Sequence, residues 1–190
     1  RTDLALEDKE RFDSERVEVP GVVLHETYDE EREIRVTTVR IETENGAKTM
    51  RKPVGTYVTI EAPNLSLPDE GIHREVSEEF AKNLLEAIEK VGQKERKKAG
   101  ILVVGLGNRE VTPDALGPYV ADNLNITRHI IKEYGKYAMT ENDSFIISAI
   151  VPGVTAQTGM ETAEILKGIV QETKPDILVV IDALAARNSR

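Results

Sequence analysis

The sequence predicts an α/β protein, a three-layer sandwich in which helices flank a mostly parallel sheet, with an antiparallel β meander on its N-terminal side. Three apolar runs predict the sheet, at 101–105, 145–151 and 177–181. Continuous runs rich in Val and Ile are typical of strands buried on both faces of a parallel sheet. Helical patterns separate the runs, which is the β–α–β order of a doubly wound sheet.

The first third of the chain has another pattern. Residues 1–20 are charged and show little periodicity, so we expect an arm or a short helix on the surface. The segment 34–41 is rich in β-branched residues, Asn45-Gly46 is a two-residue hairpin signal, and 56–60 resembles a further strand. These features predict an antiparallel meander.

Helices are expected between the later runs. Residues 62–74 contain two Pro and one Gly and indicate a loop, and 77–91 has helical spacing closed by Gly92. Further helices are predicted from about Pro118 and over 160–173.

These elements predict an arm at 1–20 and a single α/β domain over 21–190, made of a meander at 21–62 and a core at 75–190. Three parallel strands with an open edge are unusual for a complete α/β domain. We therefore expect residues 1–190 to be the N-terminal part of a longer chain.

Composition excludes several classes of function. The net charge is −9, which argues against nucleic acid or an anionic membrane as a partner. The sequence has no Cys, so disulfides, thiol catalysis and zinc–thiolate sites are excluded. No signal-peptide pattern opens the chain and no apolar run approaches ~20 residues. We expect a soluble intracellular protein.

Two aspartates follow the first and last apolar runs. Asp114 lies in a Gly-rich segment after 101–105, and Asp182 directly follows 177–181. Because ligands bind outside the carboxyl ends of strands in open α/β sheets, both acids are expected at the functional edge. A charge placed after buried apolar residues is poorly solvated, and two close carboxylates do not easily both ionise, so one keeps a proton. Such a pair acts as base toward water and as acid toward a leaving amide nitrogen.

Other roles for these acids stay open. Asp114 follows Pro113 and is also placed to cap the next helix, and Asp182 is also placed to pair with Arg187 or to cap a helix at 183–186. The two carboxylates are equally suitable oxygen ligands for a divalent metal. The Gly105-Leu106-Gly107 turn is not a dinucleotide fingerprint, because Glu110 stands where the third Gly is required.

Long motifs carry a resemblance to a known family. They are Gly-Leu-Gly-Asn at 105–108, Thr-Pro-Asp-Ala-Leu-Gly-Pro at 112–118, Ile-Val-Pro-Gly-Val at 150–154, Thr-Gly-Met-Glu-Thr at 158–162 and Ile-Asp-Ala-Leu-Ala-Ala-Arg at 181–187. With the opening segment 1–5, they resemble the spore germination proteases of endospore-forming bacteria over essentially the whole chain.

The resemblance implies an atypical aspartic-type endopeptidase that begins the degradation of small acid-soluble spore proteins during germination. It implies a homotetramer in the cytoplasm of the forespore and spore core, with no cofactor. It implies a zymogen activated by N-terminal processing, which maps onto the bond between Asp3 and Leu4. Asp114 and Asp182 correspond to the catalytic aspartates. The acidic segment 7–10 is expected either to cover the cleft or to be a solvated tail.

The fold implied is of the phosphorylase/hydrolase-like type, and it is similar to that of the hydrogenase-maturation endopeptidases. In that family the two corresponding acids bind nickel of the substrate, and Asp114 stands where it has Glu. Two alternatives follow: a metal-dependent endopeptidase with Asp114 and Asp182 as ligands, and a non-catalytic module that binds a partner protein. Residues 1–190 alone are expected to be weakly active or inactive.

Overall fold

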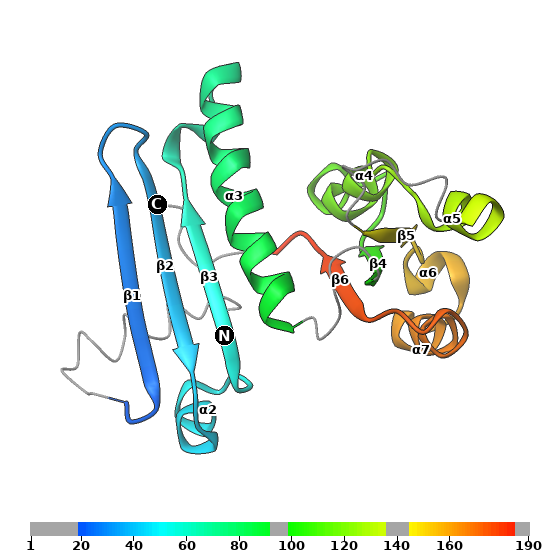
Figure 1. The fold of residues 1–190 in the computed structure, drawn as a ribbon, viewed down its shortest axis with the longest axis horizontal. Coiled ribbons are helices and arrows are strands. Elements are labelled where there is room, and N and C mark those ends of the chain that lie inside the picture. The colour runs from blue at the N-terminus through cyan, green and yellow to red at the C-terminus, as the bar shows by residue number, and fades with distance from the viewer. Residues whose placement is uncertain (1–18, 92–98, 136–144, 185–190) are drawn as a thin grey trace. The chain divides into compact units, whose positions relative to one another are not determined.

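The computed structural model describes residues 19–91, 99–135 and 145–184 (Figure 1). The chain divides into two compact units, and the division falls between Leu85 and Glu86. The N-terminal unit contains an antiparallel sheet, and the second unit contains a parallel sheet. Both belong to the predicted α/β class.

The N-terminal unit is built on the predicted meander. Its strands are β1 (Val22–Asp29), β2 (Ile34–Ile41) and β3 (Gly55–Glu61), in the order β1-β2-β3. Both pairings are antiparallel, with Val39 opposite Leu24 on one side and Tyr57 on the other. The central strand β2 carries the buried residues, whereas β1 is exposed along nearly its whole length. Burial raises the pKa of the Tyr57 phenol above its usual value.

The connection between β2 and β3 corrects the sequence prediction, because Asn45-Gly46 lies in helix α2 (Glu44–Met50) and not in a hairpin. Thr43 caps this helix, since its Oγ1 accepts a hydrogen bond from Gly46 N–H at 3.1 Å. A Cβ on Gly46 would lie 3.1 Å from the carbonyl oxygen of Gly21. The glycine therefore serves close packing, and Met50 carries the helix into the core.

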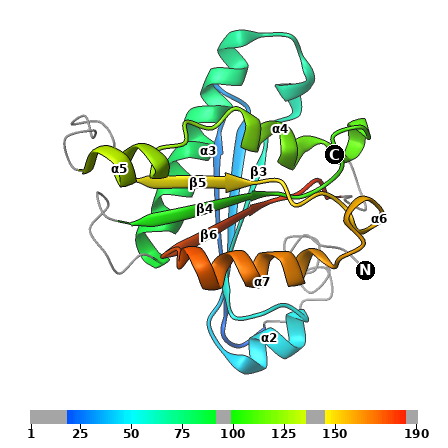
Figure 2. The same ribbon diagram turned by 90° about the vertical axis from the view of Figure 1, so that its right-hand side faces the viewer.

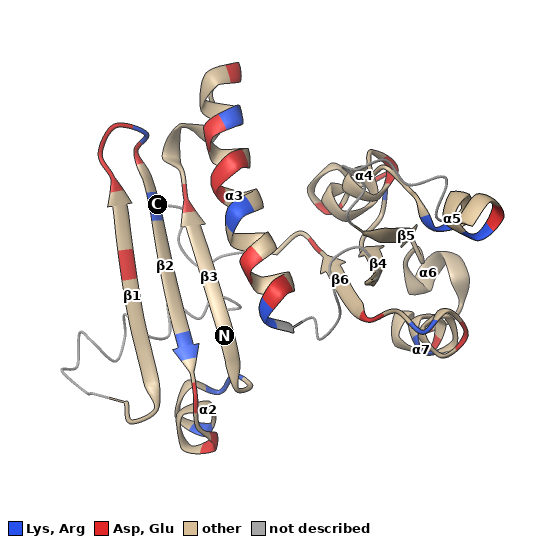
Figure 3. Ribbon diagram, in the orientation of Figure 1, with Lys and Arg blue, Asp and Glu red and all other residues tan. Residues whose placement is uncertain are grey.

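The predicted loop over 62–74 is also partly wrong. It contains a short 3₁₀ helix, η1 (Pro63–Ser66), and helix α3 (Glu70–Val91) begins seven residues before the predicted start. The carboxylate of Asp69 accepts hydrogen bonds from Gly71 N–H at 2.8 Å and Ile72 N–H at 3.2 Å, which satisfies free donors of the first turn. Figure 3 shows acidic and basic residues along α3.

The second unit is a three-layer sandwich. Its parallel strands are β4 (Gly100–Gly105), β5 (Ile146–Ile150) and β6 (Ile177–Ile181), in the order β5-β4-β6. None carries a charged residue (Figure 3). Helices cover both faces (Figure 2): α4 (Leu116–Asp122) and α5 (Arg128–Tyr134) on one, α6 (Thr155–Thr158) and α7 (Thr162–Thr173) on the other. This confirms the predicted fold class.

The three strands differ in burial. Central β4 is buried at every position from Ile101 to Gly105, as predicted. Strand β6 is not: Leu178 is 46% and Val180 47% exposed. The expectation that this strand is buried on both faces is wrong: the face that carries Leu178 and Val180 is largely exposed, and β6 lies at an edge of the sheet in the described part of the chain. Among the described helices, none is long and apolar enough to cross a bilayer.

One residue, Thr127, satisfies backbone groups at the start of β5, at the opposite edge of the sheet. Buried Thr127 donates through Oγ1 to Phe145 O at 2.9 Å, and the same oxygen accepts from Ile147 N–H at 2.9 Å. Its own backbone N–H donates to Ile147 O at 3.1 Å. The outer backbone groups of Phe145 and Ile147 are thus satisfied locally, which buried polar groups require.

Candidate functional site

The candidate site lies at the carboxyl edge of the parallel sheet, between the loops after β4 and β5. The first loop leads to α4 on one face and the second to α6 and α7 on the other (Figure 2). Neighbouring strands whose connections diverge in this way form the ligand-binding crevice of a doubly wound sheet. A crevice of about 290 Å³ is found there, lined by 107–110, 151–153, Gln157 and Thr158.

Asp114 is folded back onto the turn after β4. It ends the 3₁₀ helix η3 (Thr112–Asp114), and its Oδ2 accepts a hydrogen bond from Asn108 N–H at 2.8 Å. Helix α4 has Ala115 at its N-cap and receives no side-chain cap. The alternative in which Asp114 caps this helix is therefore wrong. Its half-buried carboxylate is aimed at the Gly-rich turn.

Gly107 makes this arrangement possible. Its φ is +113°, and a Cβ there would lie 1.9 Å from the carbonyl oxygen of Asp114 and 3.1 Å from its Oδ1. A side chain at this position would collide with the backbone of the aspartate. Close backbone approach thus explains both glycines of the Gly-x-Gly pattern, since Gly107 faces Asp114 and a Cβ on Gly105 would lie 2.2 Å from the carbonyl oxygen of Gly117.

Asp182 is brought to the same edge by strand register. Ile181 pairs with Gly105 across β4 and β6, and its carbonyl oxygen accepts from Leu106 N–H at 2.8 Å. The next residue, Asp182, thus begins where the β4 turn begins. Its side chain is exposed, and its Oδ1 accepts from Ala183 N–H at 2.9 Å.

The cap and ion-pair alternatives for Asp182 fall at the end of the described chain. Ala183 and Leu184 are not helical, and Arg187 lies outside the described residues. The structure therefore brings together the segments that carry the two acids. The catalytic roles of Asp114 and Asp182 stay a prediction.

Comparison with known proteins decides the family. A family model described as germination protease matches residues 1–190. The chain belongs to the germination protease family. The resemblance drawn from the sequence motifs is thereby confirmed.

Its relatives share this description across bacterial species. A germination protease of Caldanaerobacter subterraneus subsp. tengcongensis is 49% identical over 98% of this chain and 54% of its own length. One of Clostridium perfringens (strain SM101) is 46% identical over 98% of the chain and 55% of its own length. One of Bacillus cytotoxicus is 40% identical over 99% and 50%. The chain spans about half the length of the curated relatives it matches.

Two features proposed from the sequence cannot be placed relative to this site. The processing bond Asp3–Leu4 and the acidic segment 7–10 lie outside them. Within the described ranges, no three His, Cys, Asp or Glu side chains gather closely enough to hold a metal ion. The two aspartates therefore have no third such ligand there.

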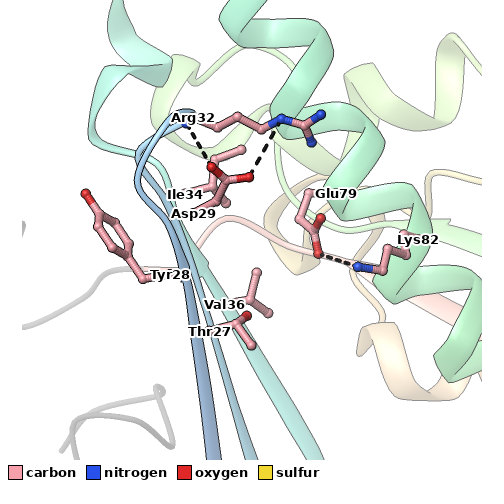
Figure 4. Close-up of a pocket in the computed structure, with 8 residues that line it drawn as sticks. All are labelled: Thr27, Tyr28, Asp29, Arg32, Ile34, Val36, Glu79 and Lys82. Carbon is pink, nitrogen blue, oxygen red and sulfur yellow. Dashed lines mark hydrogen bonds and ion pairs between the residues drawn. The ribbon is translucent and has the colours of Figure 1, made fainter.

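A second crevice, of about 260 Å³, occurs in the N-terminal unit (Figure 4). Its two cations are already matched by acids: Arg32 Nε lies 3.8 Å from Asp29 Oδ2, and Lys82 Nζ lies 3.5 Å from Glu79 Oε1. Both pairs are close in sequence and three of the four side chains are exposed, so the pairs are worth little to stability. Because its two acids, Asp29 and Glu79, are each paired with a cation, this crevice is a weaker candidate than the carboxyl edge of the parallel sheet.

Sequence reasoning gave no role to two residues at the site, Asn108 and Gln157. The Asn108 side-chain oxygen accepts from Glu110 N–H at 3.0 Å, which is a turn that Asn favours after a Gly-rich segment. That signal was available in the Gly-Leu-Gly-Asn motif. Gln157 donates from Nε2 to the same oxygen at 3.4 Å across 49 positions of sequence, and no local pattern announces such a contact.

Proposed function

We propose that this chain carries the catalytic centre of an endopeptidase that acts in spore germination, with Asp114 and Asp182 as a carboxylate pair. One observation carries the proposal. The Asp114 carboxylate is folded onto the turn after β4, and the register of β4 with β6 starts the Asp182 segment at that same turn. The family and the names of its members support the reaction class.

The pair works through one shared proton. The ionised carboxylate takes a proton from water as the water oxygen attacks the peptide carbonyl carbon. The protonated partner then gives its proton to the amide nitrogen, and the carbon–nitrogen bond breaks. Each acid ends in the protonation state in which the other began. We therefore expect a pH optimum in the acidic to neutral range.

The finer assignments rest on the family. We propose small acid-soluble spore proteins as substrates, a homotetramer as the working assembly, and the cytoplasm of the forespore and spore core as its location. We propose further that the protein is a zymogen, activated by cleavage between Asp3 and Leu4. We propose no cofactor for either substrate cleavage or N-terminal processing.

The test is a pair of isosteric substitutions in the complete natural protein, Asp114→Asn and Asp182→Asn. Each should abolish both cleavage of a small acid-soluble spore protein and N-terminal processing, because neither amide can exchange the proton. Glu172→Gln, an exposed acid on α7, is the matched control and should leave both reactions intact. Cleavage that survives either aspartate change removes that residue from the mechanism.

A chelator separates this reading from the metal-dependent one. We expect activity to be unchanged after dialysis against EDTA. Activity that is lost in EDTA and restored by a divalent ion would instead assign the two aspartates as ligands.

A further inference from the structure

We infer that Asn108 and Gln157 form an amide bridge across the crevice and that this bridge positions Asp114 for the reaction. The amide bridge denotes the side chains of these two residues and the hydrogen bond between them. They are positioning residues, acting through Asp114, so the inference rests on the proposed function.

The backbone of one bridging residue, Asn108, holds the Asp114 carboxylate. Asn108 N–H donates to Asp114 Oδ2 at 2.8 Å, the shortest contact of the series. The Asn108 side-chain oxygen accepts from Glu110 N–H at 3.0 Å and from Gln157 Nε2 at 3.4 Å. A single residue thus orients its backbone N–H toward the acid while its side chain is held from two directions.

The polarity of both amides is fixed by backbone donors. Glu110 N–H can only donate, so the Asn108 atom that faces it is the oxygen. At the other end, Val154 N–H lies 3.5 Å from the Gln157 side-chain oxygen. The remaining NH₂ group of Gln157 is therefore the one that faces Asn108. The two side chains are complementary in one orientation.

The bridge connects the two loops that leave the sheet in opposite directions. Asn108 belongs to the loop after β4, and Gln157 belongs to α6 after β5. Gly153 leaves room for it, since a Cβ there would lie 3.2 Å from the Gln157 side-chain oxygen. Both bridging residues line the crevice of about 290 Å³. A change in the distance between these loops would therefore shift Asn108 and, through its N–H, the position of the Asp114 carboxylate.

The bridge should matter for rate more than for stability. Gln157 is exposed and its bonds are long, so removing them costs little folding free energy. A catalytic group displaced by a fraction of an ångström still loses much of its effect, because reacting atoms must meet in a narrow geometry. This separation between kcat and the melting temperature makes the inference testable.

The first test is Gln157→Glu in the complete natural protein, assayed on a small acid-soluble spore protein. Glutamate keeps an acceptor for Val154 N–H but has no donor for Asn108, and it sets oxygen against oxygen. We expect kcat to fall roughly tenfold, with KM and the melting temperature almost unchanged. Gln171→Glu, the same change at an exposed position of α7, is the matched control and should leave kcat unchanged.

The second test is Asn108→Asp, which keeps the acceptor oxygen and therefore the bridge. It adds a negative charge close to Asp114, so the pH profile of kcat should move to higher pH, since a like charge disfavours ionisation of its neighbour. Because the acceptor is kept, kcat at the shifted optimum should stay close to that of the natural protein, and a tenfold fall there would overturn the bridge. Should Gln157→Glu lower the melting temperature, Gln157→Ala removes the donor without adding a charge: a fall in kcat then supports the bridge, and an unchanged kcat overturns it.

The outcomes separate the bridge from the proposed function. An inactive Asp114→Asn together with full kcat in Gln157→Glu overturns the bridge and leaves the function standing. An active Asp114→Asn overturns the function itself. A rise in KM at constant kcat for Gln157→Glu shows that Gln157 contacts substrate, and this also overturns the bridge.

Discussion

The ends of β4 and β6 are neighbours in one sheet, but they support their aspartates differently. Gly105 and Ile181 are paired, and each strand leads into a segment with one candidate acid. Asp114 is held by a backbone donor and by close contact with Gly107, whereas exposed Asp182 accepts only a local bond from Ala183 in the described structure. The difference indicates that one acid is set by its turn and the other by strand register.

The largest effect should come from Gly107→Ala, which attacks the β4 end alone. The added Cβ would lie 1.9 Å from the carbonyl oxygen of Asp114, and φ of +113° is unfavourable for alanine. Because backbone atoms cannot yield as a flexible side chain does, the turn must move. We expect peptidase activity to be lost and the free energy of unfolding to fall by roughly 3 kcal/mol.

The control is Gly159→Ala, at a glycine with φ of +69° and no neighbour within 4 Å of the added Cβ. Strain without collision should cost only about 1 kcal/mol. Activity should be retained. If Gly107→Ala is active, Asp114 does not depend on its turn and the comparison fails.

The second-largest effect is a difference in kcat between two conservative variants, Asp114→Glu and Asp182→Glu. An extra methylene moves the first carboxylate away from Asn108 N–H, whereas the exposed second side chain has room to adjust. We expect kcat to fall about 100-fold for Asp114→Glu and about tenfold for Asp182→Glu. Both are measured with one substrate at one pH. Equal losses would show that the two acids are held alike.

Sequence patterns predicted those features that residues close together in the chain determine. The three apolar runs gave the parallel strands, and the position of Asp114 and Asp182 after the first and last runs placed both acids at the carboxyl edge of the sheet. The same local reasoning placed a hairpin at Asn45-Gly46, where Thr43 instead caps a helix that packs on the meander. Packing of α2 against the meander decides between a hairpin and a helix, and a two-residue pattern gives no information on that packing.

Other features depended on contacts distant in sequence. The hydrogen bond from Gln157 to Asn108 forms only because β4 and β5 are neighbours in the sheet. The residues around Asn108 and Gln157 do not indicate which strands pair. Likewise, an apolar run at 177–181 predicts a strand but not whether both faces are covered. Elements packed on those faces from elsewhere in the chain decide that, and the face with Leu178 and Val180 is left largely exposed.

The smallest effect is a difference in stability between two variants, each with one Val→Ala substitution, at paired positions of β4 and β6. Val104 of β4 is fully buried, and its register partner Val180 of β6 is 47% exposed. Val104→Ala should lower the free energy of unfolding by about 2 kcal/mol, because it removes buried methyl groups and leaves a cavity. Val180→Ala should cost below about 1 kcal/mol, since much of that side chain is already in water. Chemical denaturation of both variants of the complete natural protein measures the difference. Equal costs would mean that another segment or subunit covers this face of β6, and the end of β6 would then be as firmly supported as that of β4.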